Sequence, residues 1–166
     1  MSTELTLERC VEFAISTEEN GAKFYNQLAE KFGNNKDVAD LFTRLSQDEE
    51  VHKKQFSKLL KELPNAQAAP LRDMDFDYIV AMSSSEFFSY DEGPFKNIER
   101  VKTQDDALGA AFELEKATLS FYNAVKEYLG ENNILNHIIE AEKGHVVAIM
   151  KVMVTGGKFR SLQDKW

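Results

Sequence analysis

Two related stretches decide the fold of this chain: Ala14-Ile15-Ser16-Thr17-Glu18 and Ala111-Phe112-Glu113-Leu114-Glu115. The shift in numbering that places Glu18 on Glu115 also places Tyr25 on Tyr122, so the two stretches belong to one internal repeat. Self-similarity of this kind indicates that the chain is built from two similar halves.

Each half continues with a second run that carries the pattern Glu-x-x-His. Around all four runs, apolar residues recur at the spacing of an α-helix. They predict helices over about residues 6–32, 36–63, 103–129 and 134–154. Gly and Asn residues between the members of each pair predict short turns. Helices joined by a short turn pack antiparallel, so the sequence predicts two helical hairpins.

The connection between the hairpins is long, at about residues 64–102. Pro64, Pro70 and Pro94 mark turns in it, and residues 76–88 are apolar enough to predict a short helix lying on the bundle. A helix of about 25 residues is roughly 40 Å long, and a connection of this length can return along it. We therefore predict an all-α fold, a four-helix bundle with one long crossover, as a single domain over residues 1–166.

Composition excludes several classes of protein. Hydrophobic residues make up 43% of the 166 residues and charged residues 29%, which is typical of a globular protein. No apolar run approaches the ~20 residues that span a bilayer, and the first residues do not resemble a signal peptide. We therefore expect a cytoplasmic protein without a membrane partner. A net charge of −8 argues against nucleic acid as a partner.

Six acidic and imidazole side chains fall on the apolar stripes of the four helices. They are Glu18, Glu49, His52, Glu115, Glu142 and His145. Residues three apart share a helix face, so each Glu-x-x-His presents a carboxylate and an imidazole to one point. Counted from the turns, the three residues of the first hairpin are level. Those of the second are offset by ~5 Å at helical rise, which predicts an irregular helix or a misplaced turn there.

A cluster of four glutamates in a dry core needs compensating charge. The carboxylates would otherwise repel one another and lose their hydration. Two divalent cations cancel the four charges and accept carboxylate oxygen and imidazole nitrogen, and such ligands suit iron, manganese and zinc alike. Bundles with one Glu on each of two helices and Glu-x-x-His on the other two form a known dimetal arrangement. The sequence therefore predicts a pair of metal ions.

These residues and their spacing resemble the ferritin-like di-iron carboxylate superfamily and, within it, the rubrerythrin-type proteins. The resemblance covers roughly residues 6–62 and 103–154. It implies a ferritin-like fold and iron as the metal. It also implies terminal ligands at Glu18 and Glu115, bridging ligands at Glu49 and Glu142, and one metal each for His52 and His145. The activity it implies is oxidation of iron(II) by peroxide or dioxygen, with peroxide reduced to water.

Two features depart from the rubrerythrin pattern. Full-length rubrerythrins receive electrons through a rubredoxin segment, in which four cysteines hold one iron. This sequence has one cysteine, Cys10, so we expect a rubrerythrin-type protein without that segment and with an external electron donor. Rubrerythrins also tend to have an extra carboxylate one turn from the third-helix ligand, where this chain has Phe112 and Thr118.

Four further residues near the six have two interpretations each. Tyr25 and Tyr122 either hydrogen-bond to ligand carboxylates and orient them for catalysis, or are core aromatic residues whose hydroxyls find any partner. Asp48 could accept a hydrogen bond from the metal-binding histidine of the other half, although a solvated Asp is favoured. Ala141 occupies the equivalent place in the second half. For His137, which lies off the Glu-x-x-His pattern, a satisfied or exposed histidine is favoured over a metal ligand.

Three hypotheses about function follow. The first is a non-haem di-iron oxidoreductase that takes peroxide or dioxygen as oxidant. The second is an iron-binding or iron-handling protein without turnover. The third is a helical interaction module with a structural metal pair. Small bundles of this kind often pair, so we expect a homodimer by analogy.

Overall fold

The computed structural model describes residues 7–63, 81 and 96–155, and these residues form an all-α bundle. Its helices are α1 (Leu7–Lys31), α2 (Lys36–Glu62), α4 (Gln104–Leu129) and α5 (Asn133–Thr155), with a 3₁₀ turn, η2, at Lys96–Glu99. No strand occurs among the described residues. The predicted all-α four-helix bundle is therefore confirmed. No described helix is long and apolar enough to cross a membrane.

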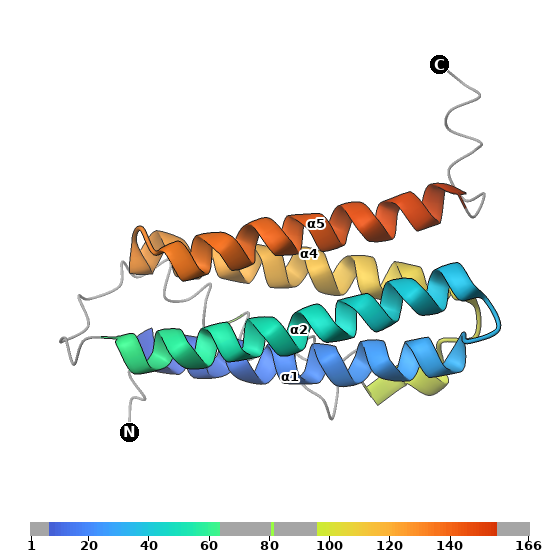
Figure 1. Cartoon of the computed structure of the whole chain (residues 1–166), viewed down its shortest axis with the longest axis horizontal. Coiled ribbons are helices and arrows are strands. Elements are labelled where there is room, and N and C mark those ends of the chain that lie inside the picture. Colours follow the sequence, from blue (N-terminus) through green and yellow to red (C-terminus); the bar gives the residue numbers. More distant parts are fainter. Residues whose placement is uncertain (1–6, 64–80, 82–95, 156–166) are drawn as a thin grey trace, which may run out of the picture.

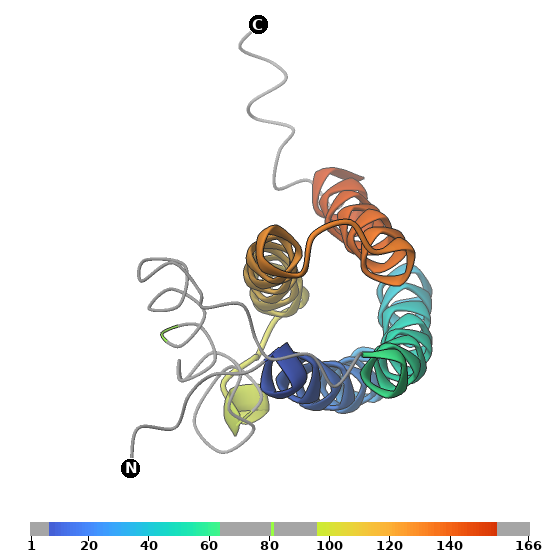
Figure 2. The same cartoon turned by 90° about the vertical axis from the view of Figure 1, so that its left-hand side faces the viewer.

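The axes of the four long helices lie roughly along one line, the long axis of the bundle (Figure 1). Seen along the bundle, they surround a shared interior in the order α1, α2, α5, α4 (Figure 2). The colours of Figure 1 show that α1 and α2 run in opposite directions, as do α4 and α5. α2 ends at one end of the bundle and α4 begins at the other. Apart from Ala81, the predicted short helix over residues 76–88 lies outside the described residues.

Local hydrogen bonds explain where the helices begin and end. The Asn35 side chain accepts from the Val38 amide at the start of α2. Thr103 and Asp106 form a reciprocal capping box at the start of α4, each side chain accepting from the other's backbone N–H. Gly130 ends α4 with a φ of 79°, a left-handed conformation that favours glycine. These turns lie where the sequence predicts them.

Aromatic residues pack the core on either side of the bundle's midpoint. Tyr25 of α1 stacks on Phe42 of α2 with ring centroids 6.1 Å apart, and Tyr122 of α4 packs against Phe56 of α2 at 4.9 Å. All four side chains are fully buried. Along α2, Phe42 and Phe56 flank Glu49, so two apolar layers enclose the level at which the polar cluster lies.

The predicted offset of the second hairpin does not keep its side chains apart. α4 and α5 are continuous, and the turn between them occupies residues 130–132. Glu115 Oε2 nevertheless lies 3.3 Å from His145 Nδ1. The prediction of an irregular helix or a misplaced turn is therefore wrong. Both helices are regular, so fewer residues separate the start of α5 from Glu142 than separate Glu115 from the end of α4.

Candidate metal centre

All four long helices contribute to a polar cluster in the bundle interior. α1 provides Glu18, α2 provides Glu49 and His52, α4 provides Glu115, and α5 provides Glu142 and His145. No more than 5% of any of these residues is exposed. The structure thus brings together the six side chains that the sequence singles out.

The cluster consists of two overlapping groups of four. Glu18, Glu49, His52 and Glu142 form one group, and Glu49, Glu115, Glu142 and His145 form the other. Within each group, one ligand atom from every residue lies within 4.8 Å of the others. Two residues, Glu49 and Glu142, belong to both groups. Ligands shared in this way are what two adjacent cations need as bridges.

The two histidines direct the same ring atom toward the carboxylates. His52 Nδ1 lies 2.8 Å from Glu142 Oε1 and 3.6 Å from Glu18 Oε2. His145 Nδ1 lies 3.2 Å from Glu142 Oε2 and 3.3 Å from Glu115 Oε2. The two rings stack with centroids 5.4 Å apart. Each ligand group therefore offers one imidazole nitrogen and one unshared carboxylate beside the shared Glu49 and Glu142.

Without metal, the cluster retains protons on its histidines. Burial alone favours the neutral ring, but the neighbouring Glu142 and Glu18 outweigh it and raise the pKa of His52 to about 10. Burial is likewise outweighed at His145, where Glu115 and Glu142 raise the pKa to about 11. Both rings are therefore positively charged at neutral pH.

The carboxylates divide into proton-holding and charged members. Burial, then repulsion by Glu142, raises the pKa of Glu115 to about 8. Burial, then repulsion by Glu18, raises the pKa of Glu49 well above its ordinary value. At Glu142 burial acts in the same direction, but the adjacent His145 and His52 outweigh it and lower the pKa. Protons thus supply the positive charge that cations would otherwise bring.

Several atoms of the cluster lack the partners that buried polar atoms normally have. Glu115 Oε2, both carboxylate oxygens of Glu142 and His145 Nδ1 are buried, and although they lie close to one another or to His52, none makes a hydrogen bond of good geometry among the described residues. Each buried group left unsatisfied costs about 1–3 kcal/mol. Because these four atoms face the interior of the cluster, metal ions placed there would satisfy them. Carboxylate oxygen and imidazole nitrogen are suitable donors for iron, manganese and zinc.

Comparison with protein families agrees with this geometry. The model of the rubrerythrin family matches residues 10–153, which include all six cluster residues. The chain belongs to the rubrerythrin family. No curated protein and no solved structure matches the chain. Family membership and the Glu/His cluster together point to a dimetal site in this rubrerythrin-family chain.

Two tyrosines hydrogen-bond to Glu18 and Glu115, the two glutamates that each belong to one ligand group only. Tyr25 of α1 donates a hydrogen bond to Glu115 of α4, and Tyr122 of α4 donates one to Glu18 of α1. Burial, then the charge of the partner carboxylate, raises the pKa of both phenols well above its ordinary value, so both remain donors. Each bond occupies Oε1 and leaves Oε2 directed at a histidine.

One carboxylate outside the six contacts the cluster from the surface. Asp48 Oδ2 lies 3.3 Å from His145 Nε2, on the side of the ring away from the glutamates. Arg44 Nε approaches the same oxygen at 3.6 Å. The Asp48 side chain is 38% exposed, but its contact with His145 shows that the favoured interpretation of a merely solvated Asp is wrong. His137 is exposed on α5, as favoured from the sequence.

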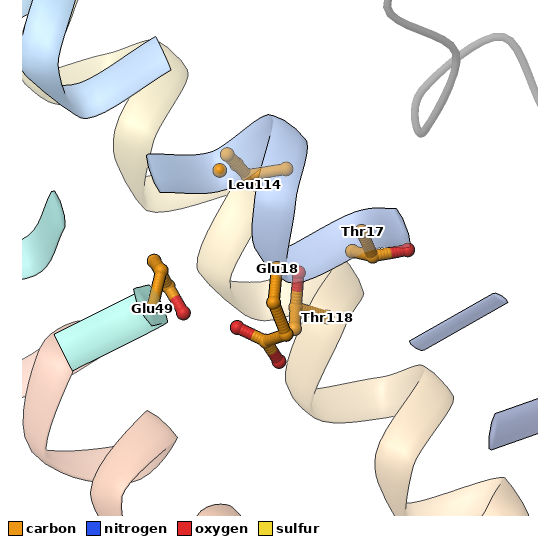
Figure 3. A pocket seen from close by; sticks show the side chains of 6 residues that line it. Thr17, Glu18, Glu49, Leu114 and Thr118 are labelled. Carbon is orange, nitrogen blue, oxygen red and sulfur yellow. The ribbon is translucent and has the colours of Figure 1, made fainter. Parts of the chain in front are cut away.

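A small pocket adjoins one side of the cluster, between α1 and α4 (Figure 3). Its lining consists of Thr17, Glu18, Gly21, Glu49, Leu114 and Thr118. It is small, with room for about one water-sized molecule, and it opens partly to solvent. A Cβ atom at Gly21 would lie 3.4 Å from Glu49 Cγ, so the glycine leaves room beside this shared carboxylate.

Sequence reasoning did not predict this pocket. The sequence feature that could have indicated it is a pair of small residues at equivalent places of the repeat, Gly21 and Thr118. Packing between α1 and α4, which the sequence does not show, turns these two positions into one space.

Proposed function

We propose that this protein is a non-haem di-iron oxidoreductase of the rubrerythrin type. It would oxidise bound iron(II) with peroxide or dioxygen, and reduce hydrogen peroxide to water. The observation that carries the proposal is the pair of overlapping ligand groups with Glu49 and Glu142 in common. One carboxylate on each of two helices and Glu-x-x-His on the other two is the arrangement that holds two metals in helical bundles.

When bound, an iron pair would supply two electrons and Lewis acidity to the oxidant. Residues of the chain would do the rest. Glu49 and Glu142 would hold the pair close together, and His52 and His145 would each bind one metal. Tyr25 and Tyr122 would keep the terminal carboxylates aimed through their hydrogen bonds.

Access of a small molecule separates this function from a purely structural metal pair. The cluster is almost entirely buried, yet the pocket beside Glu18 and Glu49 opens partly to solvent. The space accommodates about one molecule of the size of water, so it suits only molecules of a few atoms. Peroxide and dioxygen are of this size, and larger organic substrates are not.

Electrons for repeated turnover would come from a separate donor. A cysteine-held iron needs four thiolates, and the 166 residues contain only Cys10. That residue is buried on α1, and burial raises the pKa of its thiol to about 11. It is therefore an inert core residue.

The test is the rate at which the reduced iron form is oxidised. Protein loaded anaerobically with two equivalents of iron(II) is mixed in a stopped-flow instrument with peroxide, and separately with dioxygen. We expect rapid oxidation by at least one of them. The variant His145→Ala should lose most of this rate, whereas the exposed His137→Ala on the same helix should retain it.

Other outcomes identify the alternative functions. Uptake of many more than two iron ions per chain, with no turnover, would indicate iron handling. Two tightly held metals that stabilise the fold but do not react with either oxidant would indicate a structural pair. Either result would overturn the proposed oxidoreductase.

A further inference from the structure

The two halves of the cluster differ on the outer side of their histidines. His145 Nε2 has a carboxylate partner, Asp48 Oδ2, at 3.3 Å. For His52, no described carboxylate lies within 4.0 Å of Nε2, since all of its close carboxylate contacts are made by Nδ1. The repeat explains the difference, because the position equivalent to Asp48 is Ala141.

A carboxylate on the outer nitrogen changes how an imidazole binds metal. The carboxylate fixes the proton on Nε2, so that Nδ1 keeps its lone pair free to bind the metal. It also holds the ring in place and makes the ligand nitrogen more basic. Loss of such a partner typically lowers metal affinity by about 10–100-fold. Asp48 is therefore placed to strengthen one metal position of the pair and not the other.

A second, independent observation separates the same two positions. The pocket between α1 and α4 is lined by Glu18, which belongs only to the His52 group, and by the shared Glu49. Neither Glu115 nor His145 lines it. Space for an additional small ligand thus lies beside the metal position that lacks a supporting carboxylate.

We propose that the two metal positions of this chain are not equivalent. The position of His145 fills first and retains its metal, with Asp48 as its positioning residue. The position of His52 fills second, and it is the one that a small ligand in the α1/α4 pocket reaches. This inference rests on the metal pair of the proposed function, and adds a division of roles between its two members.

The test is a titration of the metal-free protein with cobalt(II), followed by its visible absorption. We expect two resolved steps. His52→Ala should abolish the weaker step and His145→Ala the tighter one, which assigns each step to its position. Asp48→Asn, which removes the charge at a half-exposed site without changing size, should weaken the tighter step by about 10–100-fold.

The repeat provides a matched reversal of the test. Ala141→Asp places a carboxylate at the equivalent site in the second half and should strengthen the step assigned to His52. The double variant Asp48→Asn/Ala141→Asp should therefore reverse the order of filling. A merely structural role for Asp48 would weaken both steps alike and would not produce this reversal.

A small anion tests the role of the pocket. Azide should change the spectrum of cobalt held in His145→Ala, where only the His52 position is filled. It should leave unchanged the spectrum of cobalt held in His52→Ala. Circular dichroism checks that each variant is folded. The titration of the unsubstituted protein tests by itself whether the two positions differ in affinity.

The outcomes separate this inference from the proposed function. Two cobalt-binding steps of equal affinity would overturn the proposed difference between the two metal positions, even if iron(II) is oxidised rapidly. So would a tight and a weak step whose affinities do not change in Asp48→Asn. Resolved steps that follow the carboxylate would support it even if neither oxidant reacts, in which case the oxidoreductase alone fails. Binding of fewer than two cobalt ions would overturn both.

Discussion

At the scale of single residues, each buried polar group of the cluster depends on its neighbours for its protonation state or its hydrogen bonds. Glu49 and Glu115 hold protons in the metal-free protein because burial and neighbouring carboxylates disfavour their charge. His52 and His145 hold theirs because glutamates surround them. The two tyrosines each donate a hydrogen bond to one oxygen of Glu115 or Glu18. Removing one member therefore leaves another without a partner.

Removing a tyrosine hydroxyl should have a measurable cost. Tyr25→Phe leaves Glu115 Oε1 buried without its donor, so we expect the metal-free protein to lose about 1–3 kcal/mol of stability. Tyr122→Phe should act similarly through Glu18. Urea unfolding measures both, with cobalt affinity as a second readout. Unchanged stability in both variants would show that the two hydrogen bonds contribute nothing.

The space beside Gly21 predicts opposite effects on stability and reaction. Gly21→Ala removes a glycine from the middle of α1, which should stabilise the helix by about 0.5–1 kcal/mol. The added methyl would lie 3.4 Å from Glu49 Cγ, a tolerable contact that reduces the pocket. We therefore expect a higher melting temperature together with slower oxidation by peroxide.

The control for Gly21→Ala is Gly109→Ala on α4. A Cβ atom at Gly109 would have no atom within 4 Å, so it should give a similar helical gain without altering the pocket. Equal oxidation rates in the two variants would exclude the pocket as the route of the oxidant.

At the scale of elements, the helices are defined by their ends as much as by their apolar stripes. The capping box at Thr103 starts α4 directly after the long connection. α4 carries Glu115 and Tyr122, so the start of this helix sets the register at which both residues meet the cluster. α2 and α5 each carry a glutamate and a histidine three residues apart, which only a regular helix presents together.

Loss of the capping box should affect stability without affecting metal binding. Thr103→Ala removes the side chain that accepts from the Asp106 amide, and should cost about 0.5–2 kcal/mol. Thr103→Ser retains an acceptor and should be close to neutral. Urea unfolding compares the three proteins, while cobalt titration should give the same two metals per chain. Weakened cobalt binding in Thr103→Ala would show that α4 shifts when its cap is lost.

At the scale of the whole molecule, the bundle joins two similar halves around a centre that neither half contains. Glu18 of the first half is hydrogen-bonded by Tyr122 of the second, and Glu115 of the second by Tyr25 of the first. Asp48 of the first half contacts His145 of the second. The shared glutamates come one from each half. Folding, cluster formation and metal binding are therefore coupled.

This coupling predicts how stability depends on pH. His52, His145 and Glu115 have their pKa values raised on folding, to about 10, about 11 and about 8. The folded protein then binds more protons than the unfolded chain, so stability is lost as pH rises through these values. We expect the melting temperature of the metal-free protein to fall between about pH 6 and pH 9.

Metal should reduce this dependence. Bound cations take the place of the protons on the histidines and glutamates, so metal binding releases protons and strengthens as pH rises. Melting temperatures with and without cobalt, measured over the same pH range, test this. A metal-free protein whose stability stays constant or rises from pH 6 to pH 9 would contradict the proton-holding cluster.

The sequence by itself determined the helices, their turns and the six cluster residues. Helical periodicity and caps are local properties, and the repeat revealed which glutamates and histidines belong together. It also indicated that four glutamates on apolar stripes need cations, because burial of charge has a large cost wherever the fold places it.

Only the tertiary structure decided which side chains meet across the two halves. The packing of α1 against α4 decides the hydrogen bonds from the tyrosine of one half to the glutamate of the other, and the pocket beside Gly21. The packing of α2 against α5 decides the contact of Asp48 with His145. The sequence offset in the second hairpin suggested a misfit that does not exist. Helix spacing fixes distances along one chain segment, whereas contacts between segments depend on the placement of whole helices, which no local pattern encodes.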